Sequence, residues 1–212
     1  MRMRRKRHRE ERMQACGALM ITELPQGGWT EVFGNENPVH IEIGCGKGKF
    51  VTDMATEHPQ INFIAVEKCL DVLVLAMERA KAAELSNVRF IPGDILTLAE
   101  LFPEGIGERI YLNFSDPWPK SGTAKRRLTA EGFLNLYRKI LAPTGGIWMK
   151  TDNRKLFEFS LTSFEENGFL LKNVCYDLHH SDFCGNVMTE YETRFAEQGM
   201  PIHRLEAYLK EI

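Results

Sequence analysis

The stretch VHIEIGCGKG, residues 39–48, decides the fold of this chain. Its first five residues are mostly apolar, and such a run predicts a short buried strand. Three glycines then follow within five residues, and the pattern from 47 to 58 places Phe50, Val51 and Met54 on one helical face. A strand that turns through glycines into a helix predicts the first half of a parallel strand–helix–strand unit.

The same alternation continues along the chain. Further strands are predicted at 61–66, 88–91, 109–114, 147–150, 169–178 and 189–196, with a last extended or helical piece at 202–208. Helices are predicted at 47–58, 70–85 and 153–167, near 96–101, and from a Thr129 cap to a stop at Pro143 and Gly145-Gly146. Strands separated by helices predict a mostly parallel sheet, whereas the last pair has no helix between its members and should be antiparallel. We therefore expect a Rossmann-like, doubly wound α/β fold: a mostly parallel seven-stranded sheet, helices on both faces and an antiparallel last strand.

The amino terminus is strongly basic. Seven positive charges stand against two glutamates in the first twelve residues, namely Arg2, Arg4, Arg5, Lys6, Arg7, Arg9 and Arg12. This density predicts a flexible arm over residues 1–28, followed by one domain at 29–212. Such arms often contact phosphate, although a tail that only improves solubility is an equally good interpretation.

Composition excludes several classes of protein. With 27 basic and 29 acidic residues, overall charge gives no sign of nucleic-acid binding, so any such sign must be local. No apolar run follows the basic start, so a secretory signal is not expected, and Glu10 and Glu11 argue against a transit peptide. No apolar run is long enough to predict a membrane span. Its five cysteines form no Cys-x-x-Cys pair, which favours a reducing cytoplasm and argues against disulfides or zinc. His179, His180 and Asp182 lack a third ligand at suitable spacing, so no metal is expected.

The glycine turn at 44–48 predicts a cofactor site. Such turns occur in dinucleotide enzymes and in S-adenosylmethionine enzymes, because glycines let the backbone approach a ligand closely. Lys49 stands where the dinucleotide fingerprint needs its third glycine, and Glu42 would repel a pyrophosphate. S-adenosylmethionine carries an ammonium and a sulfonium and has no phosphate, so this pattern favours it.

Acidic residues also follow the next two predicted strands. Glu67 could accept both ribose hydroxyls, and Asp94 could accept the adenine amine. Either acid alone could equally be a helix cap or a solvated charge. Together with Glu42 they fall at the ends of three successive strands, which favours a cofactor site that also includes Gly44, Gly46 and Gly48.

A second informative stretch is NFSDPWPK, residues 113–120. Proline cannot donate to a sheet ladder, so the fourth strand must stop here. It presents Asp116, Trp118 and Lys120 at its carboxyl end, where open α/β sheets bind ligands. A rigid loop of this kind suits methyl transfer to a ring or amine nitrogen. Asp116 could instead be a structural turn acid, and Trp118 could simply plug the sheet.

Several motifs carry a specific resemblance when taken together. They are EIGCGKG, VEK, PGDI, NFSDPWPK, KRRLT, KTDN and TEYE, in this order between about residues 29 and 195. In this combination the chain resembles the bacterial tRNA (guanine-N7-)-methyltransferase family. The resemblance implies methyl transfer from S-adenosylmethionine to N7 of the guanosine at position 46, in the variable loop of tRNA. Because N7 has no proton to lose, Asp116 is expected to lie beside the cofactor, hold the guanine edge and offset positive charge rather than act as a base.

The resemblance also implies the contacts to tRNA. These are assigned to Lys120, Lys125, Arg126, Arg127, Asp152, Thr189, Tyr191 and Glu192. Trp118 could stack on the flipped base, Asp152 could cap the next helix instead of binding, and Thr189 could simply start a strand. Residues 121–124 (SGTA) depart from the family by losing positive charge, which could shift phosphate contacts to the arm.

Other functions fit these residues less well. Methylation of a protein or small-molecule nitrogen is opposed by the basic arm and the Lys-Arg-Arg run, and a dinucleotide oxidoreductase by Lys49 and Glu42. A non-catalytic RNA-binding module would not need Asp116 beside a cofactor site. The sequence leaves monomer and homodimer open.

Overall fold

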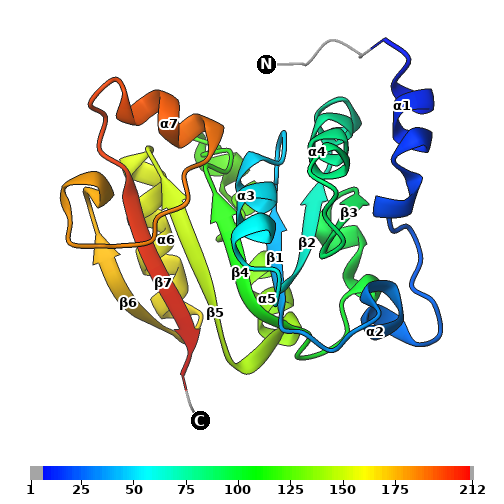
Figure 1. The fold of residues 1–212 in the computed structure, drawn as a ribbon. Helices are drawn as coiled ribbons and strands as arrows, with labels where there is room; N and C mark the ends of the chain where they lie inside the picture. The colour runs from blue at the N-terminus through cyan, green and yellow to red at the C-terminus, as the bar shows by residue number, and fades with distance from the viewer. Residues whose placement is uncertain (1–6, 211–212) are drawn as a thin grey trace. The chain divides into compact units, whose positions relative to one another are not determined.

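The computed structural model describes residues 7–210 and divides the chain into two compact units, one ending at Leu101 and the other starting at Phe102. Each unit contributes strands to a seven-stranded sheet (Figure 1). Four of the predicted arm charges lie outside the described residues, namely Arg2, Arg4, Arg5 and Lys6.

The first unit contains three parallel strands in the spatial order β3-β2-β1. They are β1 (Val39–Ile43), β2 (Asn62–Glu67) and β3 (Val88–Pro92). Every residue of β1 is buried, and so is every residue of β2 except Glu67. Strands covered on both faces need nearly continuous apolar runs, which explains why the sequence predicted all three.

Two helices connect these strands, α3 (Lys49–Glu57) and α4 (Leu70–Ala82). Gly48, just before α3, has a φ of +77°, and a Cβ built on it would lie 2.6 Å from the Cβ of Ala76 in α4. Only glycine therefore allows α3 and α4 to approach this closely. The helix predicted near 96–101 consists instead of two short 3₁₀ helices, η2 (Ile95–Thr97) and η3 (Ala99–Leu101).

Helices also form within residues 7–38, before β1. Three helices occur there: α1 (Arg9–Ala15), η1 (Gly17–Leu19) and α2 (Gly28–Phe33). Trp29 in α2 is buried, and its indole N–H donates to the Leu101 carbonyl at 2.8 Å.

α1 contacts α4 through its basic side chains. The Arg12 guanidinium donates to both carboxylate oxygens of Glu78, at 2.6 and 2.7 Å, and holds the pKa of Glu78 below its ordinary value. Arg9 lies 3.5 Å from Asp71. Two of the seven charges predicted for the arm are therefore paired with acids of the fold itself.

The second unit contains four strands in the spatial order β4-β5-β7-β6. They are β4 (Gly107–Asn113), β5 (Leu141–Thr151), β6 (Phe169–Cys175) and β7 (His203–Leu209). β4 and β5 are parallel, whereas β7 is antiparallel to both β5 and β6. The helices α5 (Glu131–Ile140) and α6 (Arg154–Glu166) pack against these strands. A seven-stranded, mostly parallel sheet with one antiparallel strand confirms the predicted fold class.

The strand predicted at 189–196 is wrong. These residues form helix α7 (Glu190–Ala196), and the Thr189 hydroxyl caps it by accepting from the Glu192 N–H at 3.0 Å. Threonines and aromatic residues favoured a strand, but Thr-x-x-Glu is also the signature of a capping box, and that local signal prevailed. The seventh strand is β7, within the piece left open as extended or helical.

The boundary between α5 and β5 also differs from the prediction. Ala130 rather than Thr129 is the N-cap of α5, and the Thr129 hydroxyl instead lies 2.7 Å from the Ser160 hydroxyl in α6. Residues 142–145 lie within β5, in an irregular part where the register against β4 shifts. A Cβ on Gly146 would lie 2.7 Å from the Tyr208 ring, so this glycine permits close strand packing rather than ending a helix.

Within residues 7–210, no helix is both long enough and apolar enough to cross a membrane.

A buried polar cluster stabilises β7. The side chains of Arg204 and Glu206 are almost fully buried and hydrogen-bonded to each other, and the Arg204 guanidinium lies 5.0 Å from the centre of the Trp148 ring. The Tyr208 hydroxyl and the Asn173 amide donate to the second oxygen of Glu206, at 2.8 and 3.0 Å. Burial alone would raise the pKa of Glu206, but the hydrogen bonds from Arg204, Tyr208 and Asn173 outweigh burial and lower it.

This arrangement predicts how stability depends on pH. Because the pKa of Glu206 in the folded protein lies below 4.5, its carboxylate stabilises the fold above that pH, and the contribution is lost as the pH falls through the lowered value. Tyr208→Phe removes one donor, so acid unfolding should begin at a higher pH, as followed by circular dichroism. Tyr176→Phe, on a half-exposed ring, is the matched control. An unchanged midpoint in Tyr208→Phe would contradict this account.

Candidate active site

The glycine turn in the first unit is anchored to the end of β2. The N–H groups of Gly44 and Cys45 both donate to the Val66 carbonyl, at 2.8 and 3.1 Å. Gly44 and Gly46 have φ angles of +82° and +58°, and a Cβ on either would meet no described atom within 4 Å. The turn therefore needs glycine for its backbone conformation and has open space beside it.

Glu67 joins this turn to the start of α4. One carboxylate oxygen accepts from the Gly46 N–H at 3.1 Å, and the other accepts from the Cys69 N–H at 2.8 Å. The Gly93 N–H donates to the Glu67 carbonyl at 3.1 Å, which ties the end of β3 to the same place. A carboxylate held at both oxygens by backbone donors stays fixed and still has lone pairs for a ligand.

Two acidic side chains lie near the buried thiol of the turn. Glu42 is 3% exposed, and the Cys45 thiol is buried as well. The pKa of Cys45 lies well above its ordinary value because burial disfavours the thiolate and because the carboxylates of Glu42 and Glu67 repel it. A cationic ligand such as S-adenosylmethionine fits this environment, whereas a pyrophosphate would be repelled.

Asp94 follows β3 and is exposed. Its Oδ1 accepts from the Leu96 N–H at 3.1 Å, so it caps the short helix η2. Asp94 is therefore a helix cap, which is one of the roles that the sequence left open for it. Only one oxygen takes part in that bond, and the second can still accept from a ligand.

In the second unit, the loop after β4 is held in an unusual backbone conformation. Phe114 and Trp118 have positive φ angles of 52° and 40°, on either side of Asp116. Bulky residues rarely adopt this conformation, and it persists only where the surroundings enforce it, most often at functional sites. Asp116 is exposed, and its side chain forms no hydrogen bond or ion pair with any residue in the described part of the chain.

Two arginines hold the loop. The Arg127 guanidinium donates to the carbonyls of Pro117 and Trp118, at 3.0 and 3.1 Å, and lies 4.3 Å from the centre of the Phe159 ring. The Arg126 guanidinium stacks on the Trp118 ring at 3.9 Å. The sequence assigned both arginines to phosphate and the Trp118 face to a base, whereas here Arg127 braces the loop and Arg126 covers one face of the indole.

Asp116 and Asp152 follow neighbouring strands. β4 and β5 are parallel with Asn113 opposite Lys150, so both acids lie just beyond the carboxyl ends of adjacent strands. Asp152 does not cap α6, since the Asn153 side chain does so by accepting from the Leu156 N–H at 2.9 Å. The side chain of Asp152 forms no hydrogen bond or ion pair with another described residue. The exposed side chains of Lys120 and Lys125 are likewise unengaged among residues 7–210.

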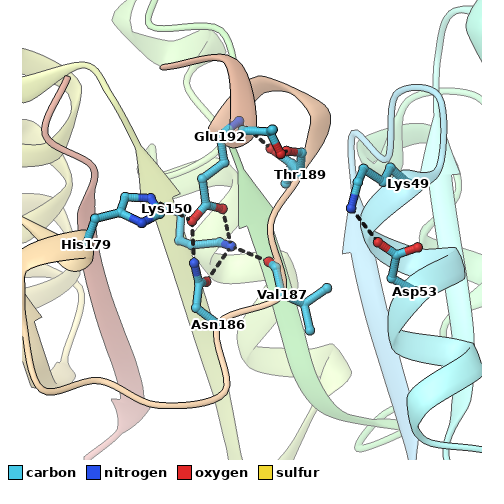
Figure 2. A network of polar contacts seen from close by, with 9 residues as sticks. Lys49, Asp53, Lys150, His179, Asn186, Val187, Thr189 and Glu192 are labelled. Carbon is cyan, nitrogen blue, oxygen red and sulfur yellow. Dashed lines mark hydrogen bonds and ion pairs between the residues drawn. The ribbon is translucent and has the colours of Figure 1, made fainter. Parts of the chain in front are cut away.

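The side chains of the predicted Thr-x-Tyr-Glu segment differ in exposure. Thr189 caps α7, and Glu192 is completely buried, 2.6 Å from the Lys150 ammonium (Figure 2). Tyr191 is 62% exposed. Sequence reasoning missed Lys150 and its partner Asn186, although a lysine at the end of an apolar strand is a signal for a buried acid partner.

Within the described residues, no group of three or more histidine, cysteine or acidic side chains could hold a metal ion. His179 and His180 have separate partners, Glu192 at 3.3 Å and Asp177 at 3.0 Å.

The chain resembles known methyltransferases in both sequence and fold. A family model described as a putative methyltransferase matches residues 36–205. Solved structures with a similar fold include a 16S rRNA methyltransferase, with a TM-score of 0.65 and 14% identity over 90% of this chain and 96% of that one. Another is a precorrin-6y C5,15-methyltransferase from Geobacter metallireducens, with a TM-score of 0.59 and 13% identity over 95% and 88%. The fold is that of the Rossmann-like methyltransferases, and the chain is a methyltransferase.

Closer relatives give the particular family. A tRNA (guanine-N(7)-)-methyltransferase of Bacillus licheniformis is 48% identical over 98% of both chains, and that of Listeria monocytogenes is 49% identical over the same shares. The enzyme of that name from Streptococcus thermophilus is 46% identical over the whole of both chains. The chain belongs to the tRNA (guanine-N(7)-)-methyltransferase family, which confirms the family indicated by the motifs.

The brace from Arg127 can be tested directly. Arg127→Gln removes the forked donor to two carbonyls, so the free energy of unfolding should fall by about 1–2 kcal/mol. Amide hydrogen exchange of the non-proline residues between 114 and 120 should accelerate as well. Lys125→Gln, two positions earlier, should change neither quantity. Equal exchange rates in the two variants would show that Arg127 does not hold the loop.

Proposed function

We propose that this protein transfers a methyl group from S-adenosylmethionine to N7 of the guanosine at position 46, in the variable loop of tRNA. The family membership supports this reaction. The observation that carries it is Asp116: an exposed carboxylate, unengaged in the described part of the chain, in a loop whose backbone is strained on both sides. We place the reaction in the cytoplasm, in line with the reduced cysteines expected from the sequence.

The first unit would hold the methyl donor. When bound, S-adenosylmethionine supplies a methyl group activated by a sulfonium. The glycine turn at 44–48 would let the backbone approach it, and the negative environment set by Glu42 and Glu67 would favour its positive charges. Glu67, which two backbone donors hold in place, would accept the ribose hydroxyls, and the second oxygen of Asp94 would accept from the adenine amine.

Asp116 would act on the guanine. N7 has an in-plane lone pair and no proton, so no general base is needed. The carboxylate can accept hydrogen bonds from the N1–H and N2–H edge of the ring and can offset the positive charge that develops on the ring. Most of the acceleration would come from positioning the two reactants.

The remaining contacts would come from groups that the fold leaves available. Lys120 and Lys125 carry exposed ammonium groups for phosphate or the guanine O6, and Asp152 follows the adjacent strand. Tyr191 presents an exposed ring from α7. Arg126 could reach phosphate while remaining stacked on Trp118.

The product identifies the reaction. The protein is incubated with labelled S-adenosylmethionine and bulk tRNA, and the tRNA is digested to nucleosides. We expect the label in N7-methylguanosine. A label on N1, on N2 or on protein would refute the proposal.

Removing the carboxylate should separate binding from chemistry. In Asp116→Ala we expect methyl transfer to fall on the order of 10²-fold or more, because electrostatic stabilisation of the developing charge is lost. Binding of S-adenosylmethionine, measured by calorimetry, should persist. Glu108→Ala, at the opposite end of β4 and also exposed, is the control and should keep full activity. Loss of cofactor binding together with activity would make Asp116 a fold residue.

The basic amino terminus can be divided by its contacts. Replacing Arg2, Arg4, Arg5 and Lys6 with glutamine should weaken tRNA binding. The slope of log affinity against log salt concentration should become shallower by about 0.7–0.9 for each phosphate contact that is lost. Arg9→Gln with Arg12→Gln, which removes ion pairs to α4, should mainly lower stability. An unchanged salt slope in the first variant would exclude the arm from phosphate binding.

A further inference from the structure

We infer that Lys150 and Glu192 form a buried latch that positions α7 and the segment before it for methyl transfer. Glu192 is then a positioning residue rather than a contact to the nucleotide. This inference rests on the proposed function and deepens it, because it assigns a task to side chains that the reaction itself does not use.

The segment between β6 and β7 needs an anchor. It runs from residue 176 to residue 202, and only η5 (Leu178–His180) and α7 are regular within it. Connections of this length that are mostly irregular are uncommon in compact domains and are usually functional. Its two ends are joined by the Leu178 N–H, which donates to the Ile202 carbonyl at 2.8 Å, but its middle depends on other contacts.

Lys150 supplies the middle contact from β5 (Figure 2). Its ammonium donates to the Asn186 side-chain oxygen at 3.0 Å, to the Val187 carbonyl at 2.8 Å and to Glu192 at 2.6 Å. Three acceptors of this one segment therefore lie within hydrogen-bond distance of a single ammonium, which has N–H groups to donate to them.

Both carboxylate oxygens of Glu192 have partners. One oxygen accepts from Lys150, and the other accepts from the Asn186 amide and lies 3.3 Å from His179. The side chain has no exposed surface, whereas the neighbouring Tyr191 is 62% exposed. A carboxylate enclosed in this way has no free face for a nucleotide, while the tyrosine one position earlier does.

The latch is continuous with the loop that carries Asp116. The Phe114 N–H donates to the Lys150 carbonyl at 2.8 Å, and the Phe114 ring stacks on Phe195 of α7 with centroids 6.5 Å apart. Lys150 is also two residues before Asp152. α7, the end of β5 and the Asp116 loop are therefore held as one assembly, and displacing a reactive group by about 1 Å can cost on the order of 10²-fold in rate.

A double-mutant cycle tests the latch with Lys150→Met, Glu192→Met and the double variant, and Lys139→Met on the exposed end of α5 is the control. Each single variant should lower kcat on tRNA about 10²-fold and leave the KM for S-adenosylmethionine unchanged. Phe183 lies in the same connection, three residues before Asn186, and chymotrypsin should cleave after it faster in both single variants. The double variant should lose no more than the worse single variant, because the two side chains act as a unit.

Additive losses in kcat with unchanged cleavage would overturn the inference and make Glu192 a substrate contact. The double variant leaves no uncompensated buried charge, so it carries the test if a single variant fails to fold. If the double variant melts close to the temperature of the unmodified protein and has a low kcat, the latch is supported. If the double variant keeps the full kcat, the latch is overturned. If the unmodified protein forms no N7-methylguanosine, the proposed function fails. The rate of chymotrypsin cleavage after Phe183 then still tests the latch, and equal cleavage rates in all variants would refute the latch.

Discussion

Burial of the parallel strands on both faces is the constraint on which the rest of this structure depends. Strands such as β1 and β2 can carry little polar chemistry along their length, because a polar side chain there must find a partner away from water. Polar groups therefore gather where the strands end, at Glu67, Asp94, Asp116 and Asp152. Within each unit the parallel pairing brings successive strand ends to one edge, so acids far apart in sequence become neighbours.

The exceptions along the strands are informative for the same reason. Glu42, Lys150, Arg204 and Glu206 are buried charged side chains on strands. Lys150 and Arg204 have acidic partners, and Glu206 keeps its pKa below the ordinary value through three hydrogen-bond donors despite its burial. Such groups cost free energy to bury, and the structure compensates with fixed, directional contacts. The contacts of Lys150 hold the long connection before β7 in place, so a buried charge of the second unit organises the surface that would meet the substrate.

Local sequence patterns were sufficient wherever a single physical signal dominated. The apolar runs of β1 to β3 and the glycine turn were predicted closely, because burial on both faces and positive φ angles leave few alternatives. The strand prediction for residues 189–196 was wrong because their composition favours a strand, whereas the Thr-x-x-Glu spacing favours a helix cap. Pro143 and Gly145 were read as a stop for α5, whereas they belong to an irregular start of β5.

The sequence by itself determined the order of the main elements from β1 to β6, the family and the acids at the strand ends, because periodicity and contiguous motifs carry this information. Only the tertiary structure decided which side chains of those motifs bond to other parts of the protein and which stay available for a ligand. Arg127 braces the Pro-Trp loop and Glu192 is enclosed by Lys150, while Asp116 and Asp152 remain unengaged among the described residues. The physical reason is that a side chain's availability depends on partners distant in sequence. Glu192 and Lys150 are 42 positions apart and meet only when the long connection folds back onto β5.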